Sequence, residues 1–120
     1  MRIRKRKLDV FPVMLHHYTR RRDFRTWMRI VGDKDPAPDA VGACRSDWDA
    51  ETGVLHVAVY VNMKSLRLQS ELELVKTLVH ESVHGAGFVL DHFEQSYCGG
   101  DETFPYLVET IFEWLMDGSS

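Results

Sequence analysis

Residues 70–85 read SELELVKTLVHESVHG, and this stretch decides how the rest of the chain is interpreted. Ser70 and Glu73 have the S-x-x-E spacing of a capping box, which satisfies free backbone N–H groups where a helix begins. Apolar side chains then recur at steps of three and four residues, at Leu72, Val75, Leu78, Val79 and Val83. That period is typical of a helix with one buried face. The pattern predicts an amphipathic helix over residues 70–85, with Gly85 and Gly87 indicating either fraying or a close approach of the backbone soon after His84.

The same helix carries His80-Glu81-Ser82-Val83-His84, the HExxH pattern of zinc-dependent hydrolases. Residues four apart lie on one face of a helix, so the imidazoles of His80 and His84 can reach a single ion. Glu81 projects beside them, where its carboxylate can take a proton from a metal-bound water. The alternative interpretation is two histidines and a glutamate on the solvated side of a helix. The capped, amphipathic context favours a metal site with Glu81 as its catalytic base.

A catalytic zinc takes three protein ligands and leaves a fourth position for water. The extended pattern HExxHxxGxxH would supply the third ligand at position 90, but Leu90 stands there. His92 comes two residues later, and it is an alternative ligand if the chain bends. The third ligand is therefore expected from a second helix.

Residues 101–116 predict that second helix. Asp101 suits the N-cap, and Pro105 lies in the first turn, where its missing N–H costs little. The apolar stripe that follows consists of Phe104, Leu107, Val108, Ile111, Phe112 and Leu115. Glu102 at the helix start is the expected third ligand, and Glu109, two turns later on nearly the same face, is the runner-up. One carboxylate can bind the metal while the other orients a histidine N–H; a solvated acidic side chain is the alternative for both.

Segments 77–84 (TLVHESVH) and 101–108 (DETFPYLV) resemble the gluzincin branch of zinc peptidases. They resemble still more closely the minimal zincin-like proteins of tailed bacteriophages. The resemblance covers residues 54 to 115, and Pro105 replaces the small alanine that is usual at its place. The first motif is the more specific of the two, because the second is short.

This resemblance implies roles for several residues. His80, His84 and Glu102 would bind Zn²⁺, and Glu81 would be the general base. Independently of the resemblance, Tyr106 on the second helix is a candidate donor to the developing oxyanion, although a residue of the core or rim is the more common interpretation. The implied fold is α+β: a minimal zincin-like domain with a small antiparallel β-sheet or hairpin packed on the HExxH helix and a C-terminal ligand-bearing helix.

Residues 40–62 predict the β-hairpin of that fold. Residues 40–47 and 54–62 read as strands around the turn 49–53, and the second strand is rich in β-forming side chains. By the resemblance, this hairpin forms the rim of the cleft and pairs with an extended peptide or protein substrate. His56 on the second strand is a candidate for contact with the substrate, but we favour its interpretation as an exposed strand histidine.

Charge is uneven along the chain. Residues 1–34 hold eleven Lys or Arg against three Asp, a balance of +8, and the remainder holds four basic and fifteen acidic residues, a balance of −11. Contact with nucleic acid is one interpretation of the basic segment. We favour a segment that lies against the acidic body or stays solvated. The helical spacing of Phe24, Trp27, Met28 and Val31 predicts a helix in this segment that covers the core.

The composition, 44% hydrophobic and 28% charged over 120 residues, is that of a soluble globular protein with one domain, 1–120. No apolar run approaches the length of a membrane span, and no signal-peptide core follows the basic N-terminus. A cytoplasmic protein is expected, in the host cytoplasm if a phage encodes it. Cys44 and Cys98 are too few for a disulfide scaffold and are expected to be free thiols.

The leading hypothesis is a zinc-dependent hydrolase, a metallopeptidase in which Glu81 activates a zinc-bound water. The alternative is a non-catalytic phage assembly or interaction protein in which zinc holds two helices together. Nucleic-acid binding through residues 1–34 is compatible with both and is not favoured.

Overall fold

A mixed four-stranded sheet stands at the centre of the fold, with the strand order β1-β2-β4-β3. The computed structural model describes residues 3–8, 11–33, 40–93 and 102–118. The strands are β1 (Ile3–Lys7), β2 (Val13–Tyr18), β3 (Gly42–Asp49) and β4 (Val54–Val61). β1 pairs antiparallel with β2, β2 pairs parallel with β4, and β3 pairs antiparallel with β4.

The hairpin expected over residues 40–62 is confirmed by β3 and β4, but the expectation of an antiparallel sheet is wrong. Two further strands, β1 and β2, come from the basic segment 1–34, and β2 joins the sheet parallel to β4. β1 reads IRKRK and is largely exposed, so it shows no apolar alternation. β2 reads VMLHHY and is buried along nearly its whole length, and a strand covered on both faces does not alternate either.

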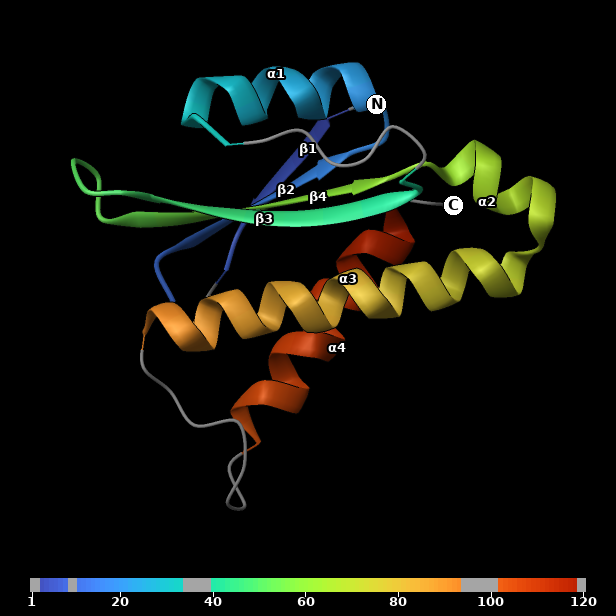
Figure 1. Ribbon diagram of the computed structural model, residues 1–120. Coiled ribbons are helices and arrows are strands. Elements are labelled where there is room, and N and C mark those ends of the chain that lie inside the picture. The colour runs from blue at the N-terminus through green and yellow to red at the C-terminus, as the bar shows by residue number, and fades with distance from the viewer. Residues whose placement is uncertain (1–2, 9–10, 34–39, 94–101, 119–120) are drawn as a thin grey trace.

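Helices cover both faces of this sheet (Figure 1). α1 (Arg21–Val31) lies on one face, and α3 (Glu71–His92) and α4 (Thr103–Asp117) lie on the other. A short helix, α2 (Met63–Gln69), leads from β4 into α3. These elements confirm the α+β class. Within the described ranges, no helix is both long enough and apolar enough to cross a bilayer.

α3 begins as the capping box predicts, but it is longer than expected. Ser70 is the N-cap, and its Oγ accepts a hydrogen bond from the Glu73 backbone N–H at 3.0 Å. The helix continues past Gly85, where we expected it to end, and stops at His92. A Cβ at position 85 would lie 3.4 Å from the Ile111 side chain and 3.5 Å from that of Val57. Gly85 therefore marks a close approach of α3 to both α4 and the sheet, which is one of the two interpretations of this glycine, and the helix does not fray there.

α4 confirms a helix at the end of the chain. It begins at Thr103 with Glu102 as its N-cap, while Asp101, which we expected at the cap, lies outside the described residues. Its buried side chains are Leu107, Ile111, Trp114 and Leu115. They pack with α3 and the inner face of the sheet into the larger of two apolar clusters.

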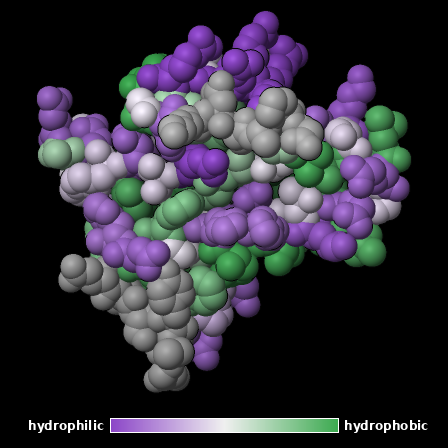
Figure 2. Space-filling model, viewed as in Figure 1, coloured by the Kyte–Doolittle hydropathy of each residue, from purple (hydrophilic) through white to green (hydrophobic). Residues whose placement is uncertain are grey.

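α1 covers the opposite face of the sheet, as the spacing of its apolar residues predicts. Phe24, Trp27 and Met28 are buried in a second cluster with aromatic residues of β2 and β4. The outer surface of this helix is hydrophilic (Figure 2). Arg4 of β1 instead packs inward: its guanidinium donates to the Trp114 carbonyl at 3.0 Å and lies 4.7 Å from the centre of the Trp114 ring.

Candidate metal centre

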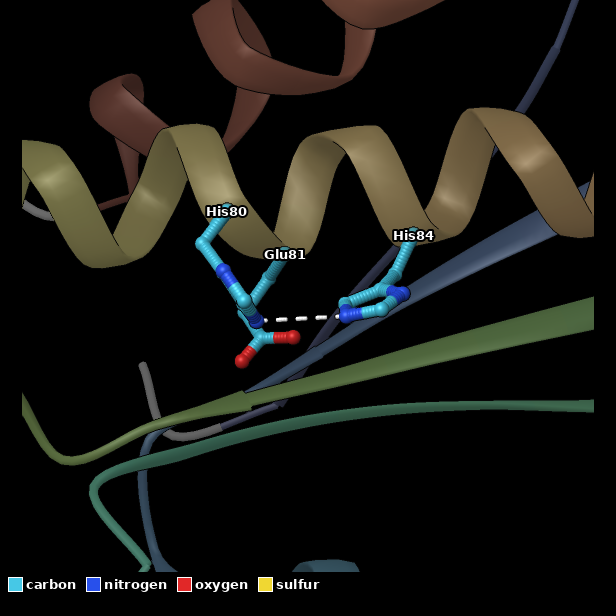
Figure 3. Close-up of side chains that lie close together, drawn as sticks. All are labelled: His80, Glu81 and His84. Atoms are coloured by element: carbon cyan, nitrogen blue, oxygen red, sulfur yellow. Dashed lines mark hydrogen bonds between the residues drawn. The ribbon is translucent and has the colours of Figure 1, made fainter.

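α3 brings His80 and His84 together one turn apart (Figure 3). Their Nε2 atoms are 3.1 Å apart, and both side chains are exposed. The carboxylate of Glu81 joins them, and the ligand atoms of all three residues lie within 4.8 Å of one another. Among the described residues, this is the group of three or more side chains that has the geometry to hold a metal ion.

Glu81 differs from the two histidines in its burial. Its side chain is only 4% exposed, because the backbone of β3 passes directly over its carboxylate. A Cβ at Gly42 would lie 2.7 Å from Glu81 Oε2 and 2.9 Å from the methyl group of Thr77. Real Cβ atoms do not approach other atoms so closely, so any side chain at position 42 would displace the Glu81 carboxylate and the Thr77 methyl group.

The surroundings of Glu81 favour its neutral form. Burial raises the pKa of its carboxyl group, while the nearby His80 and Arg45 lower that pKa in part. A raised pKa brings a carboxylate closer to the value at which it can both accept and release a proton near neutral pH.

The three side chains open into a cleft between α3 and the edge strand β3. One part of the cleft, about 330 Å³, is lined by the metal-binding group together with Cys44, Arg45 and Phe88. A second part, about 320 Å³, shares Gly42, His80 and Glu81 and extends along α3 past Thr77. The group therefore lies in the middle of a continuous groove, and small-molecule and peptide sites are typically concave in this way.

Arg45 and Gly42 are site residues that the sequence did not single out. Arg45 Nη1 donates to the Cys44 carbonyl at 2.9 Å, and its Nε lies 3.9 Å from Asp33 Oδ2. Neither residue belongs to a motif, and only the packing of β3 on α3 shows that they border the cleft. Cys44 is a buried free thiol, as expected, and burial raises its pKa; Cys98 lies outside the described residues.

The other predicted site residues do not join this group. Glu102 is the exposed N-cap of α4, Glu109 is exposed further along that helix, and Tyr106 is 48% exposed. His92 lies against Trp48, with the two ring centres 4.4 Å apart. In Figure 3, the three grouped side chains leave α3 toward β3, while α4 crosses the other side of α3. A third metal ligand from α4 stays a prediction.

Comparisons with models of known protein families, with curated proteins and with solved structures found no match. The function of the protein is therefore inferred from the chemistry of the site.

Proposed function

We propose that the protein is a zinc-dependent hydrolase that cleaves a peptide bond, with His80 and His84 as metal ligands and Glu81 as the proton-transfer group. One observation carries this proposal: two exposed imidazoles converge beside a buried carboxylate in the middle of a groove. If the two histidines were only solvated surface residues, there would be no reason for Glu81 beside them to be buried against β3.

The donor atoms suit zinc. Imidazole nitrogens and carboxylate oxygens are common ligands of this ion, with bonds of about 2.0–2.2 Å. Two nitrogens at that distance from a tetrahedral ion are about 3.3 Å apart, and the Nε2 atoms of His80 and His84 are 3.1 Å apart. By the resemblance to gluzincins, Glu102 would be the third protein ligand. When bound, zinc would make a water acidic near pH 7 and polarise the scissile carbonyl.

Glu81 would move the proton. Its carboxylate is close enough to both imidazoles to receive a proton from a water held between them. Because burial raises its pKa, Glu81 holds that proton more readily than an exposed glutamate does, and it can pass the proton to the departing amine.

The strand beside the groove supports a peptide as the substrate. β3 is the last strand in the sheet order, so its outer edge is free of any strand in the described ranges. An extended peptide can pair with such an edge through main-chain hydrogen bonds. Arg45 extends along that edge to the Cys44 carbonyl, and its guanidinium would have to move aside or bind the substrate.

The test is Glu81→Gln in zinc-loaded protein, assayed by mass spectrometry against a mixed peptide library. We expect the zinc content of wild type and a fall in hydrolysis of at least about a hundredfold, since general-base catalysis contributes about 10²–10⁴. Glu113→Gln, the same chemical change at an exposed position of α4, should leave both unchanged.

Hydrolysis that survives Glu81→Gln would remove this residue from its proposed role. Zinc bound at His80 and His84 without cleavage of any peptide would reject the hydrolase and leave the non-catalytic zinc protein.

A further inference from the structure

A second pair of histidines meets on the other face of the sheet. His16 of β2 and His56 of β4 are 40 residues apart in sequence, yet His16 Nε2 lies 2.8 Å from His56 Nδ1. The His16 ring also lies 5.8 Å from that of Trp27 in α1, so this pair lies on the face of the sheet that α1 covers, whereas the His80 group belongs to α3, which covers the opposite face (Figure 1). The two histidine groups are thus separated by the sheet.

The surroundings of His16 fix the direction of its ring. Only 3% of the residue is exposed, and its Nδ1 lies 3.2 Å from the Tyr18 hydroxyl. When Nδ1–H donates to the tyrosine oxygen, the Nε2 lone pair points toward His56 and accepts a hydrogen bond from His56 Nδ1–H, a proton that a bound metal ion would displace. Metal-binding histidines are commonly oriented in this way, because a partner on one nitrogen fixes the tautomer that leaves the other free.

The pair opens into a pocket with an excess of negative charge. The pocket measures about 500 Å³, and three carboxylates, Asp47, Asp49 and Glu51, line it with a single lysine, Lys5. Asp47 of β3 is directly opposite His56 of β4 in the antiparallel register, so the two residues are cross-strand neighbours. Lys5 opposes a cation, but the three carboxylates outweigh it.

We propose that His16 Nε2, His56 Nδ1 and the Asp47 carboxylate form a second metal site, for Zn²⁺ or another late first-row divalent ion. Imidazole with carboxylate is a donor set that these ions prefer. The nitrogen separation of 2.8 Å is comparable to the 3.1 Å of the His80–His84 pair. In the structure the Asp47 carboxylate does not lie together with the two imidazole nitrogens as the ligand atoms of the His80 group do, so Asp47 binds only after its side chain turns toward the pair, and water fills the remaining positions. An ion at this position would connect β2, β4 and β3, which makes its expected effect a gain in stability.

The experiment measures Zn²⁺ bound per chain by equilibrium dialysis at pH 7.5 in four proteins. These are wild type, His80→Ala/His84→Ala, His56→Gln, and the combination of all three changes. We expect about two equivalents, one, one and none, respectively, if each group holds one ion. Glutamine at position 56 keeps a partner for His16 Nε2 but is a poor zinc ligand, so the fold is retained. Val54→Ala, on the same strand and face, is the matched control and should keep two equivalents.

A second measurement follows thermal unfolding of His80→Ala/His84→Ala with and without Zn²⁺. Binding to the native state alone raises the melting temperature, and adding His56→Gln should abolish that rise. The proposal is overturned if His56→Gln binds as much Zn²⁺ as wild type, or if the second equivalent binds only at millimolar concentration. The result for His80→Ala/His84→Ala reports on the first site separately, so either site can fail alone.

Discussion

The two histidine pairs have nearly the same nitrogen separation but reach it by different routes. His80 and His84 are one turn apart on α3, and both are exposed. His16 and His56 come from strands 40 residues apart, and His16 is buried. The first pair needs only a helix, whereas the second needs the whole sheet. The His80–His84 pair can be predicted from sequence because its spacing matches one helical turn. The His16–His56 pair cannot, because it depends on the pairing of two strands that are distant in sequence.

The strand pair therefore depends on register in a way that the helix pair does not. β2 and β4 pair in parallel with Met14 opposite His56 and His16 opposite Ala58. A slip by one residue would turn His56 to the other face of the sheet and separate the rings. Substitutions on α3 should consequently change metal binding at the His80–His84 pair only. Substitutions that weaken the pairing of the strands should change metal binding at the His16–His56 pair.

The largest expected effect is His84→Ala, which leaves a single imidazole in the α3 group. We expect the zinc affinity of that group to fall by about a thousandfold, equivalent to about 4 kcal/mol, because even loss of a residue that merely orients a ligand costs about 10–100-fold. Competition with a chromophoric chelator in the His56→Gln background measures this site alone. Thermal stabilisation by zinc at the His16–His56 pair should be unaffected in His84→Ala itself.

The same assay identifies the third ligand. The resemblance predicts a loss of affinity with Glu102→Ala and no loss with Glu109→Ala or His92→Ala. A loss confined to Glu109→Ala or His92→Ala would transfer the role of third ligand to that residue.

An intermediate effect on stability is expected when the pH is lowered, because two residues of β2, His16 and His17, are buried in their neutral form. Burial lowers the pKa of His16 to about 4, and burial with the Arg4 charge lowers that of His17 to about 4. Both lie below the ordinary value of 6.5, so the unfolded chain binds protons first as the pH falls. The free energy of unfolding should be fully retained above pH 6.5 and decrease between pH 6.5 and 4, by up to about 3 kcal/mol per histidine.

Urea unfolding of chelator-treated protein across this pH range measures the decrease. His17→Leu should remove about half of the slope. It should also leave the protein no less stable at pH 7, since His17 Nε2 is a buried atom without a hydrogen-bond partner in the described structure. A pH profile identical to that of wild type would show that His17 is not the titrating group.

The smallest expected effect comes from Gly42→Ala. This substitution lies on β3 and affects the His80–Glu81–His84 group only by displacing neighbouring side chains of α3. The new methyl group would meet the Glu81 carboxylate and Thr77. We expect a loss of about 1–2 kcal/mol in stability and about a tenfold loss of hydrolysis as Glu81 is displaced. Gly42→Ala/Thr77→Ser removes the methyl group that the new Cβ would meet and should recover part of the stability but not the activity. Unchanged hydrolysis in Gly42→Ala would mean that the position of Glu81 tolerates movement.

Sequence predicted the elements whose signals are local. The cap at Ser70, the helical spacing of Phe24 and Trp27, and the hairpin of β3 and β4 are each encoded within a short window. β1 and β2 were missed because neither shows alternation: one is a charged edge strand and the other is covered on both faces. The sequence left Gly85 open between fraying and a close approach, because only tertiary packing shows its contacts.

In the candidate site, too, some features could be predicted from local sequence patterns and others depend on tertiary packing. The positions of His80, Glu81 and His84 on one helix follow from helical geometry alone. The approach of Gly42 to Glu81 and the meeting of His16 with His56 depend on how strands and helices pack, which no local pattern records.

The parallel pairing of β2 with β4 also bears on how the chain assembles. During synthesis, β2 emerges long before β4 and has only β1 as an early partner, whereas β3 and β4 can form a hairpin as soon as both have emerged. Joining the two halves closes a long loop, a step that is slow in proteins rich in non-local contacts. The junction of these two hairpins is therefore where we expect the rate-limiting barrier of folding, and where a chaperone would find exposed strand edges.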